Sequence, residues 1–500
     1  MRNLLSSSER RRLELIETLL VMDDWTTLEW LASKLNTNSR TIREDIKYFR
    51  TKFDDFTIST NHDGVRIEFV PDGGLKRFYG QILRGSLPFN VLEEIFFDEN
   101  LSVDELADKL YVSVSSIYRA IRQINNILTD NYKATIKTNP CRLIGNEKNI
   151  RNIYYAYFKE AYSILEWPFQ AINEDDFNQS FKSLLRIFPF DISHVVDFAY
   201  VESVKIGVAV NKIRYSANHL LTDLPAEETA WSTQLIELLN SHQVNPFLSP
   251  NGKPLYENSR ESFYQLYSPF LTIQTVFSEE MLLVQRKENS QLDKAINTFV
   301  SDILRYSDEL GITVNADVAA LALIGTFSIE SDDPNNLFIL FDRDYHFIRD
   351  FENRFPAVTD RIRKIIITFR QNLRLDLEEK NVNHGLYTLL TIWEDLFTQI
   401  NEIYYSLKVT IISDGHKSHG KFLADFINSQ LKVNPQFTVY NKLSISVDEL
   451  DKIGSDLIIT NFELPQDVTT PNVMIEHFPT KKDIQHIEES VRFIFNDRTS

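Results

Sequence analysis

A group of basic and hydroxyl side chains between residues 39 and 50 carries the clearest chemical signal near the start of this 500-residue chain. Its polar members are Ser39, Arg40, Thr41, Arg43, Lys47 and Arg50. Between them, Ile42, Ile46 and Phe49 recur at the spacing of one helix face. A helix that buries this apolar face would offer its basic surface to solvent, as a helix that lies in the major groove of DNA must do.

The residues before this helix predict a shorter helix and a turn. Leu28, Leu31, Ala32 and Leu35 follow helical spacing, and the polar residues 36–38 break the pattern. Ser39 is a good N-cap, so we expect the second helix to begin there. Residues 26–50 therefore resemble a helix-turn-helix, and an ordinary helical hairpin with basic residues is the alternative.

The same pattern occurs a second time in the chain. The sequence LASKLNTNSRTIREDI at residues 31–46 matches LADKLYVSVSSIYRAI at residues 106–121, without a gap and at a constant offset of 75 residues. Leu31 and Ala32 coincide with Leu106 and Ala107. Residues 102–105 begin with serine and end with glutamate, which is a capping-box pattern at the start of the second copy. An ungapped repeat favours DNA binding over a chance hairpin.

Each copy is followed by two short β-prone segments joined by a turn. The first pair is residues 56–59 and 65–69, around the turn at 61–64, which ends in Asp-Gly. The second pair is residues 134–137 and 142–144, around 138–140. A helix-turn-helix with a hairpin is a winged unit, so we expect two such units in tandem.

Composition limits the remaining possibilities. The length suggests about three or four domains. Hydrophobic residues make up 43% of the chain, yet no apolar run approaches the ~20 residues of a membrane span. We expect no secretion signal, no membrane association and a cytoplasmic location. Cys141 is the one cysteine, which excludes an intramolecular disulfide and a multi-cysteine metal site.

The net charge of −18 is unusual for a DNA-binding protein, but it is unevenly distributed. Residues 1–150 carry a net charge of −1, whereas residues 151–500 carry −17. A near-neutral segment can bind phosphates when its positive charges share one face. We therefore expect DNA to dock on the first 150 residues and affinity to fall steeply with salt.

The rest of the chain changes character twice. Helical periodicity with many aromatic residues dominates residues 150–405, and we divide this tract near residue 288 into two all-α bundles. Strand-like segments then alternate with helical ones: strands at 408–412, 437–440, 456–460 and 473–476, helices at 420–431, 447–453 and 481–495. This alternation predicts a small α/β domain with a parallel sheet. The fold class is thus multidomain and mainly α.

Motifs for catalysis or for cofactor binding are not found. The chain has no phosphate-binding glycine loop, no HExxH and no GxSxG, so we expect no enzyme activity, no metal and no cofactor. The most site-like stretch is residues 413–420, SDGHKSHG, between a strand and a helix. It is either an anion site or, as we prefer, a polar strand-to-helix turn. Cys141, in the second wing, is interpreted as a structural thiol.

This order of domains resembles the Mga/AtxA family of transcriptional regulators. The most specific local sign is LIGNEKNIR at residues 143–151, after the second wing. The resemblance covers the whole chain and implies winged units at 1–72 and 73–149. It also implies PTS-regulation-domain (PRD) bundles at 150–287 and 288–405, and an enzyme-IIB-like domain at 406–500 that mediates oligomerisation.

The resemblance also raises the question of phosphorylation, because histidines in such regulation domains are phosphorylated. The position that corresponds to the family's histidine in the first bundle lies near Lys205, and lysine does not serve in that relay. His194, His219 and His384 are the substitute candidates. Ser413 stands about where a catalytic enzyme IIB carries its cysteine, so phosphoryl transfer by the last domain is not expected.

We therefore predict a DNA-binding transcriptional regulator, an activator, that forms a homodimer or a higher oligomer on double-stranded promoter DNA. The residues expected to contact DNA are Arg40, Thr41, Arg43 and Lys47 in the first unit, Ser115, Ser116, Tyr118, Arg119, Arg122 and Gln123 in the second, and Arg66, Lys133 and Lys137 in the wings. The alternative is a phosphorelay protein served by the phosphocarrier of the sugar phosphotransferase system. An RNA-binding antiterminator is a third interpretation, which the tandem winged units disfavour.

Overall fold

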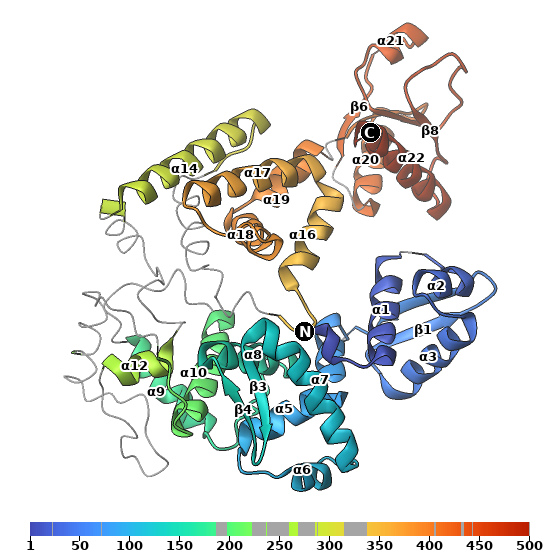
Figure 1. Cartoon of the computed structure of the whole chain (residues 1–500). Coiled ribbons are helices and arrows are strands. Elements are labelled where there is room, and N and C mark those ends of the chain that lie inside the picture. Colours follow the sequence, from blue (N-terminus) through green and yellow to red (C-terminus); the bar gives the residue numbers. More distant parts are fainter. Residues whose placement is uncertain are drawn as a thin grey trace. The chain divides into compact units, whose positions relative to one another are not determined.

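The computed structural model describes residues 1–22, 24–71, 73–186, 198–222, 237, 260–268, 286–287, 289–314, 338–404, 407–431, 435–442 and 444–499. The chain forms two compact units (Figure 1). The first comprises residues 1–303 and 319–392, and the second comprises residues 304–318 and 393–500.

The first winged unit begins with a short 3-10 helix, η1 (Arg2–Leu4), and helix α1 (Ser7–Val21). Helices α2 (Leu28–Lys34) and α3 (Ser39–Lys52) follow, and then the hairpin of β1 (Phe56–Thr60) and β2 (Val65–Phe69). Thr26 adds an antiparallel bridge to Val65. Gly64 is needed at this bridge, because its φ is +137° and a Cβ there would lie 2.2 Å from the carbonyl oxygen of Thr26.

The second winged unit repeats this plan. Helices α4 (Leu75–Gly85) and α5 (Leu87–Phe97) lead into α6 (Val103–Lys109) and α7 (Val114–Tyr132), and then into β3 (Ala134–Thr138) and β4 (Cys141–Gly145). The bounds of α6 and the first residue of α7 lie 75 residues after those of α2 and α3. Asn36 and Tyr111, the turn residues with positive φ (49° and 54°), also differ by 75. The repeat predicted from the sequence is thus present in the backbone.

The capping residues differ in one place from the prediction. Asn38, not Ser39, is the N-cap of α3, because its side chain accepts a hydrogen bond from the Thr41 backbone N–H at 2.9 Å. The equivalent residue of the second unit is Ser113, which caps α7 in the same way. The predicted capping box of Ser102 and Glu105 is confirmed. Ser39 is therefore the first residue inside the helix.

Helical segments fill the rest of the first unit. They are α8 (Glu147–Ala161), α9 (Glu174–Arg186), α10 (Phe198–Ser216), α12 (Arg260–Tyr267), α14 (Ser290–Leu310), α16 (Arg343–Arg354), α17 (Pro356–Asn372) and α18 (Glu379–Ile392). Residues of α14 from 304 onward belong to the second unit. The helix expected at 315–328 and most of that expected at 257–286 lie outside the described residues, as do His194 and His242. Among the described helices, none combines the length and apolar character that a membrane crossing requires.

The second winged unit is joined to the bundle behind it by a buried ionic network. The guanidinium of Arg214, on α10, bonds to the Glu147 carboxylate at 2.7 Å and to the Glu99 carboxylate at 2.5 Å. Only 1% of the Arg214 side chain is exposed. Glu99 lies between α5 and α6 and also bonds to His219 at 2.7 Å. The charges are thus paired, as buried charges must be.

A second junction within the first unit is made by Glu160, at the end of α8. Its carboxyl group accepts hydrogen bonds from the backbone N–H groups of Ile339, Leu340 and Phe341, the last two at 2.8 and 3.1 Å. Burial raises the pKa of Glu160 to about 7, although these three donors and the charge of Lys159 act in the opposite direction. The carboxyl group therefore titrates within the range of physiological pH.

Stability should consequently depend on the protonation of Glu160. A carboxyl pKa that is higher in the folded protein than its ordinary value of 4.5 stabilises the fold fully below that value, and the contribution is lost as pH rises toward 7. We expect the parent to lose stability between about pH 5 and pH 8 more steeply than Glu160→Gln. Urea unfolding of both proteins across this range tests it, and parallel curves would contradict the assignment. The amino group of Met1 and Lys76 also act on Glu160, so their charges are kept unchanged in the variant.

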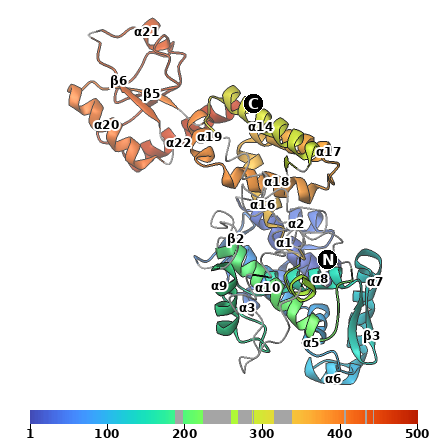
Figure 2. The same ribbon diagram turned by 90° about the vertical axis from the view of Figure 1, so that its left-hand side faces the viewer.

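The second unit holds a parallel sheet, as predicted. Its strands are β5 (Lys408–Ile412), β6 (Gln436–Val439), β7 (Leu457–Thr460) and β8 (Asn472–Met474), in the order β6-β5-β7-β8. Its helices are α19 (Leu396–Tyr404), α20 (Lys417–Gln430), α21 (Val447–Asp451) and α22 (Lys481–Thr499). Val409 and Ile459 pack with α20 and α22 on one face, and Ile458 packs with Leu450 of α21 on the other (Figure 2).

Candidate nucleic-acid interface

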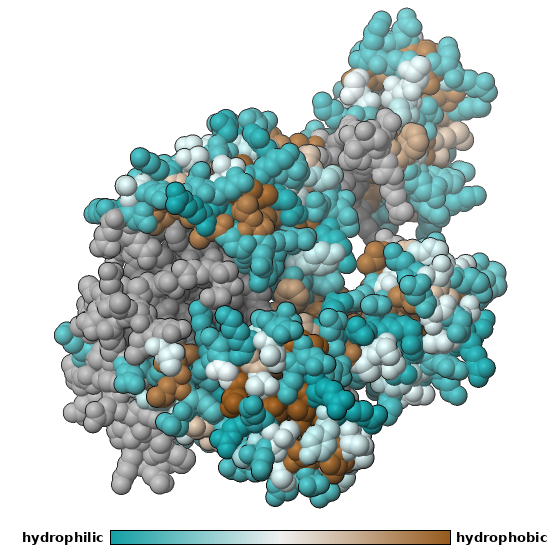
Figure 3. All heavy atoms as spheres, viewed as in Figure 1, coloured by the Kyte–Doolittle hydropathy of each residue, from teal (hydrophilic) through white to brown (hydrophobic). Residues whose placement is uncertain are grey.

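Helix α3 presents two long cations to solvent. Arg43 and Lys47 are exposed and lie one turn apart on the helix. Among the described residues, no carboxylate pairs with either. Ile42, Ile46 and Phe49 are buried on the opposite face, which fixes the orientation of the helix. The surface over this unit is mostly hydrophilic in the view of Figure 3.

Three other predicted contacts of the first unit carry local bonds. Arg40 pairs with Glu44 at 3.1 Å, and Arg66 pairs with Glu68 at 2.9 Å. Exposed pairs of this kind are worth about 0–1 kcal/mol, so DNA phosphates could replace the carboxylates at little cost. The Thr41 hydroxyl donates to Asn38 at 3.2 Å and thereby supports the cap.

Helix α3 is held in place from behind by charge. Asp45 is buried, and its carboxylate accepts hydrogen bonds from Arg11 at 2.7 Å and from Arg12 at 2.9 Å, both on α1. Arg50 donates to the carbonyl oxygen of Ile58 at 2.6 Å and so ties the helix to the wing. Because Arg50 has this structural bond, the cations that the helix offers to a ligand are those nearer its N-terminus.

Helix α7 presents a similar face in the second unit. Tyr118, Arg119 and Arg122 are exposed, with Tyr118 50% accessible. Arg119 donates to the Ser116 hydroxyl at 3.2 Å. Ser115 and Ser116 both bond to the Ser113 hydroxyl at the start of the helix, at 2.9 and 2.8 Å. These groups stand at the N-terminal part of the helix, where a groove-reading helix makes its contacts.

Gln123 behaves differently from the other predicted contacts. Its side-chain amide donates to the carbonyl oxygens of Asn3 and Leu4, both at 3.0 Å. The residue is half-buried under the N-terminal segment, so it serves packing between the two winged units. The sequence could not indicate this contact, because its partners lie 119 and 120 residues away.

The second wing adds a cation that the sequence analysis did not assign. Lys137 and Arg142 are directly opposite in the β3–β4 register, and both are exposed. Like charges directly opposite each other destabilise a hairpin, so this pair is better explained by an external anion. Lys133 is exposed and adopts a left-handed conformation where α7 ends. The hairpin register was the signal that could have identified Arg142.

Tyr111 is a second residue that the sequence analysis did not assign. It lies in the turn between α6 and α7 and is 95% exposed. A large aromatic side chain held so far out of the core has no role in packing. Cys141, by contrast, is fully buried in β4, and burial raises the pKa of its thiol, as expected of a structural cysteine.

The candidate phosphorylation residues occupy ionic contacts. His219 bonds to Glu99 through Nε2, and His384 bonds to Asp344 through Nδ1 at 2.6 Å. Both side chains are largely buried. Lys205 is buried as well, and its ammonium bonds to Glu202 at 2.8 Å.

The loop at residues 413–420 satisfies its polar groups internally. Ser413 Oγ lies 2.8 Å from His419 Nδ1 and also accepts a hydrogen bond from the Gly415 N–H at 3.0 Å. The Asp414 N–H donates to Asn461 at 3.0 Å. These bonds are those of a polar strand-to-helix turn.

Comparison with known proteins finds two family matches at the winged units. Residues 6–63 match the M protein trans-acting positive regulator (MGA) HTH domain, and residues 74–158 match the Mga helix-turn-helix domain. The first match ends within the first wing, and the second runs from the segment before α4 to α8. Both units identified from the internal repeat are therefore helix-turn-helix domains of the Mga type.

Three relatives match along nearly the whole chain. A protein of Streptococcus pneumoniae serotype 4, assigned by its name to the trans-acting regulators, is 27% identical over 471 residues, which are 93% of this chain and 94% of its own. The anthrax toxin expression trans-acting positive regulator of Bacillus anthracis is 22% identical, covering 97% and 99%. The capsule synthesis positive regulator AcpB of the same organism is 21% identical, covering 96% and 97%.

The family matches and these relatives agree with the resemblance that the sequence itself suggested. Two Mga-type domains stand in tandem at its start, and relatives from two genera share almost its full length. This chain belongs to the Mga/AtxA family of trans-acting transcriptional regulators.

Proposed function

We propose that this protein activates transcription by binding duplex promoter DNA through α3 and α7, with the two wings on neighbouring phosphates. The carrying observation is that two helices at one sequence offset each expose arginines on the face opposite their buried residues. A single basic helix has many explanations, but a duplicated one with a cationic wing has few. The residues proposed to contact DNA are Arg40, Thr41, Arg43, Lys47, Arg66, Tyr111, Ser115, Ser116, Tyr118, Arg119, Arg122, Lys133, Lys137 and Arg142.

The proposal of activation rests on the relatives. Two of the three are named positive regulators, and each is matched over at least 96% of this chain. We extend the sign of regulation to this chain on that basis. On the family resemblance, residues 150–287 and 288–405 would act as PRD-like regulatory bundles and residues 406–500 as an enzyme-IIB-like domain.

DNA binding is tested by the salt dependence of affinity. Fluorescence anisotropy with duplexes selected from genomic fragments should give a logarithmic affinity that falls linearly with the logarithm of salt concentration, by about 0.9 for each phosphate contact. Several contacts should give a slope of about −4 or steeper. A salt-independent affinity, or a preference for RNA of the same sequence, would overturn the proposal.

Self-association is proposed to use an aromatic cluster of the second unit. Phe422 and Phe478 are 44% and 62% exposed, and both stack with Phe426 on the same surface. A cluster of exposed aromatic rings is typical of protein interfaces rather than of free surface. A second copy of this chain is the occupant that the family resemblance implies.

The double variant Phe422→Ser, Phe478→Ser should therefore dissociate. Loss of interface residues worth about 2 kcal/mol each weakens association at least about 30-fold. Light scattering across a dilution series should show the parent as an oligomer and the variant as a monomer. Tyr345→Ser, an equally exposed aromatic on the first unit, is the control. Equal masses for parent and double variant would contradict this surface.

A phosphorelay role is the second candidate, with the sugar phosphocarrier as partner. His219 and His384 each have one ring nitrogen engaged by a carboxylate, so a phosphoryl group at that nitrogen would have to displace the carboxylate and would be repelled by it. The observation favours plain DNA regulation. Incubation with the phosphocarrier and phosphoenolpyruvate distinguishes the two, since stoichiometric phosphohistidine would support the relay.

A further inference from the structure

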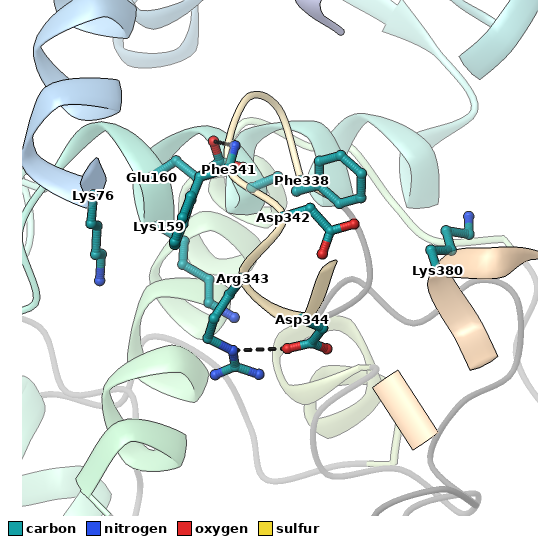
Figure 4. A pocket seen from close by; sticks show the side chains of 10 residues that line it. Lys76, Lys159, Glu160, Phe338, Phe341, Asp342, Arg343, Asp344 and Lys380 are labelled. Atoms are coloured by element: carbon teal, nitrogen blue, oxygen red, sulfur yellow. Dashed lines mark hydrogen bonds and ion pairs between the residues drawn. The ribbon is translucent and has the colours of Figure 1, made fainter. Parts of the chain in front are cut away.

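A cavity of about 140 Å³ lies within the first unit, where three separate segments of the chain meet (Figure 4). Lys76 of α4 and Lys159 and Glu160 of α8 line one side. The segment that runs from Phe338 into the start of α16 lines the other. The cavity therefore borders the second winged unit and the helices that follow it.

Three cations extend from three elements into this region. Figure 4 shows Lys76, Lys159 and Arg343 pointing in the same direction, whereas Lys380 is turned away. Lys380 pairs with Glu378 at 3.0 Å. Burial, followed by the charges of Lys159 and Arg343, lowers the pKa of Lys76, which means that these like charges are close enough to repel.

The carboxylates of the cavity are engaged elsewhere. Glu160 accepts from three backbone N–H groups, and Asp342 accepts from the Tyr345 N–H at 2.9 Å as the cap of α16. Asp344 bonds to both Arg343, at 2.9 Å, and His384, at 2.6 Å. Among the described residues, no carboxylate forms a hydrogen bond or ion pair with Lys76. The cavity thus gathers positive charge that its own acids do not pair one to one.

The chemistry of the site fits a phosphate group. A phosphate oxygen set accepts several charge-assisted hydrogen bonds at once, which suits three converging cations better than a single carboxylate does. The volume equals only a few water molecules, each of which takes about 30 Å³ in the liquid, so the ligand must be small. Ala156, Phe338 and Phe341 supply apolar wall for a short organic group.

We propose that this cavity binds a small phosphate-bearing anion through Lys76, Lys159 and Arg343, and that the bound anion fastens the second winged unit to α16. Neutralising the three charges removes their mutual repulsion, so the bound form holds α4, α8 and α16 together more firmly. Binding of the anion does not itself require DNA. The ligand is either free phosphate or a small phosphate monoester, and the two share this chemistry.

Isothermal titration calorimetry of the full chain with inorganic phosphate and with glycerol 3-phosphate tests the site, at ionic strength held constant with sodium chloride. We expect saturable one-to-one binding of at least one probe. The probe that binds more tightly identifies the source of the phosphate group. Lys76→Gln and Lys159→Gln should each weaken binding about tenfold or more, as expected from removal of a charge-assisted hydrogen bond. Lys294→Gln, an exposed lysine on α14, should bind like the parent.

Hydrogen exchange supplies a second measurement that does not depend on variants. The backbone N–H groups of Ile339, Leu340 and Phe341 should exchange more slowly when the anion that bound in calorimetry is added to the parent. Absence of saturable binding by the parent to both probes overturns the proposal. Equal affinities of the parent, Lys76→Gln and Lys159→Gln also overturn it.

Discussion

Arg43→Ala combined with Arg119→Ala should reduce affinity for duplex DNA about 100-fold or more. Each arginine is exposed on the outer face of its helix, and removing one charge-assisted hydrogen bond from an interface costs about 1.5–3 kcal/mol. Two such changes correspond to at least two decades in the dissociation constant. The salt slope should also become shallower by about two, one for each phosphate-binding cation removed. Anisotropy titrations at several salt concentrations measure both effects.

The control must change charge equally without touching the winged units. Arg305→Ala with Arg349→Ala removes two arginines of α14 and α16 and should leave affinity within about twofold of the parent. Thermal unfolding should be similar for all three proteins, because Arg43 and Arg119 are on the surface. If the double variant binds DNA as the parent does, the two helices are not the DNA-contacting surface.

Arg214→Ala should produce the largest loss of stability. The side chain is almost wholly buried and bonds to two carboxylates, and its removal leaves Glu99 and Glu147 without their shared cation. Breaking a buried ion pair in this way costs about 3–5 kcal/mol. The midpoint of urea unfolding should fall accordingly, and the second winged unit should become more susceptible to proteolysis.

A graded series separates the ionic role of Arg214 from its volume. Arg214→Lys keeps one charge but cannot bridge two carboxylates with a planar group, so it should be intermediate. Glu99→Gln removes one of the two ion pairs and should cost less than Arg214→Ala. Equal stability of Arg214→Ala and the parent would mean that the network does not hold the winged unit to the bundle.

The sequence predicted the winged units well because their signals are local. The spacing of Ile42 and Ile46, the turn after each short helix and the 75-residue repeat are all readable within a few residues. The cap of α3 was wrong by one position, since Asn38 and Ser39 are both good caps and only the hydrogen bond to Thr41 decides between them. The parallel sheet was predicted from the alternation of strands and helices, but its strand order was not.

The contacts that join the segments could not be predicted, because they are distant in sequence. His219 meets Glu99 across 120 residues, and Glu160 meets Leu340 across 180. Neither partner carries a pattern that points to the other. The cavity at Lys76, Lys159 and Arg343 has the same origin, since its cations are brought together only when α4, α8 and α16 pack.

Photo-crosslinking tests the DNA-contacting helices most directly. A benzophenone amino acid in place of Lys47 or Tyr118 should crosslink to bound duplex DNA, because each position lies on the exposed face of α3 or α7. The same group in place of Tyr345, an exposed residue of α16, should not. Crosslinking at Tyr345 with none at Lys47 or Tyr118 would show that DNA lies against another surface and would contradict the account.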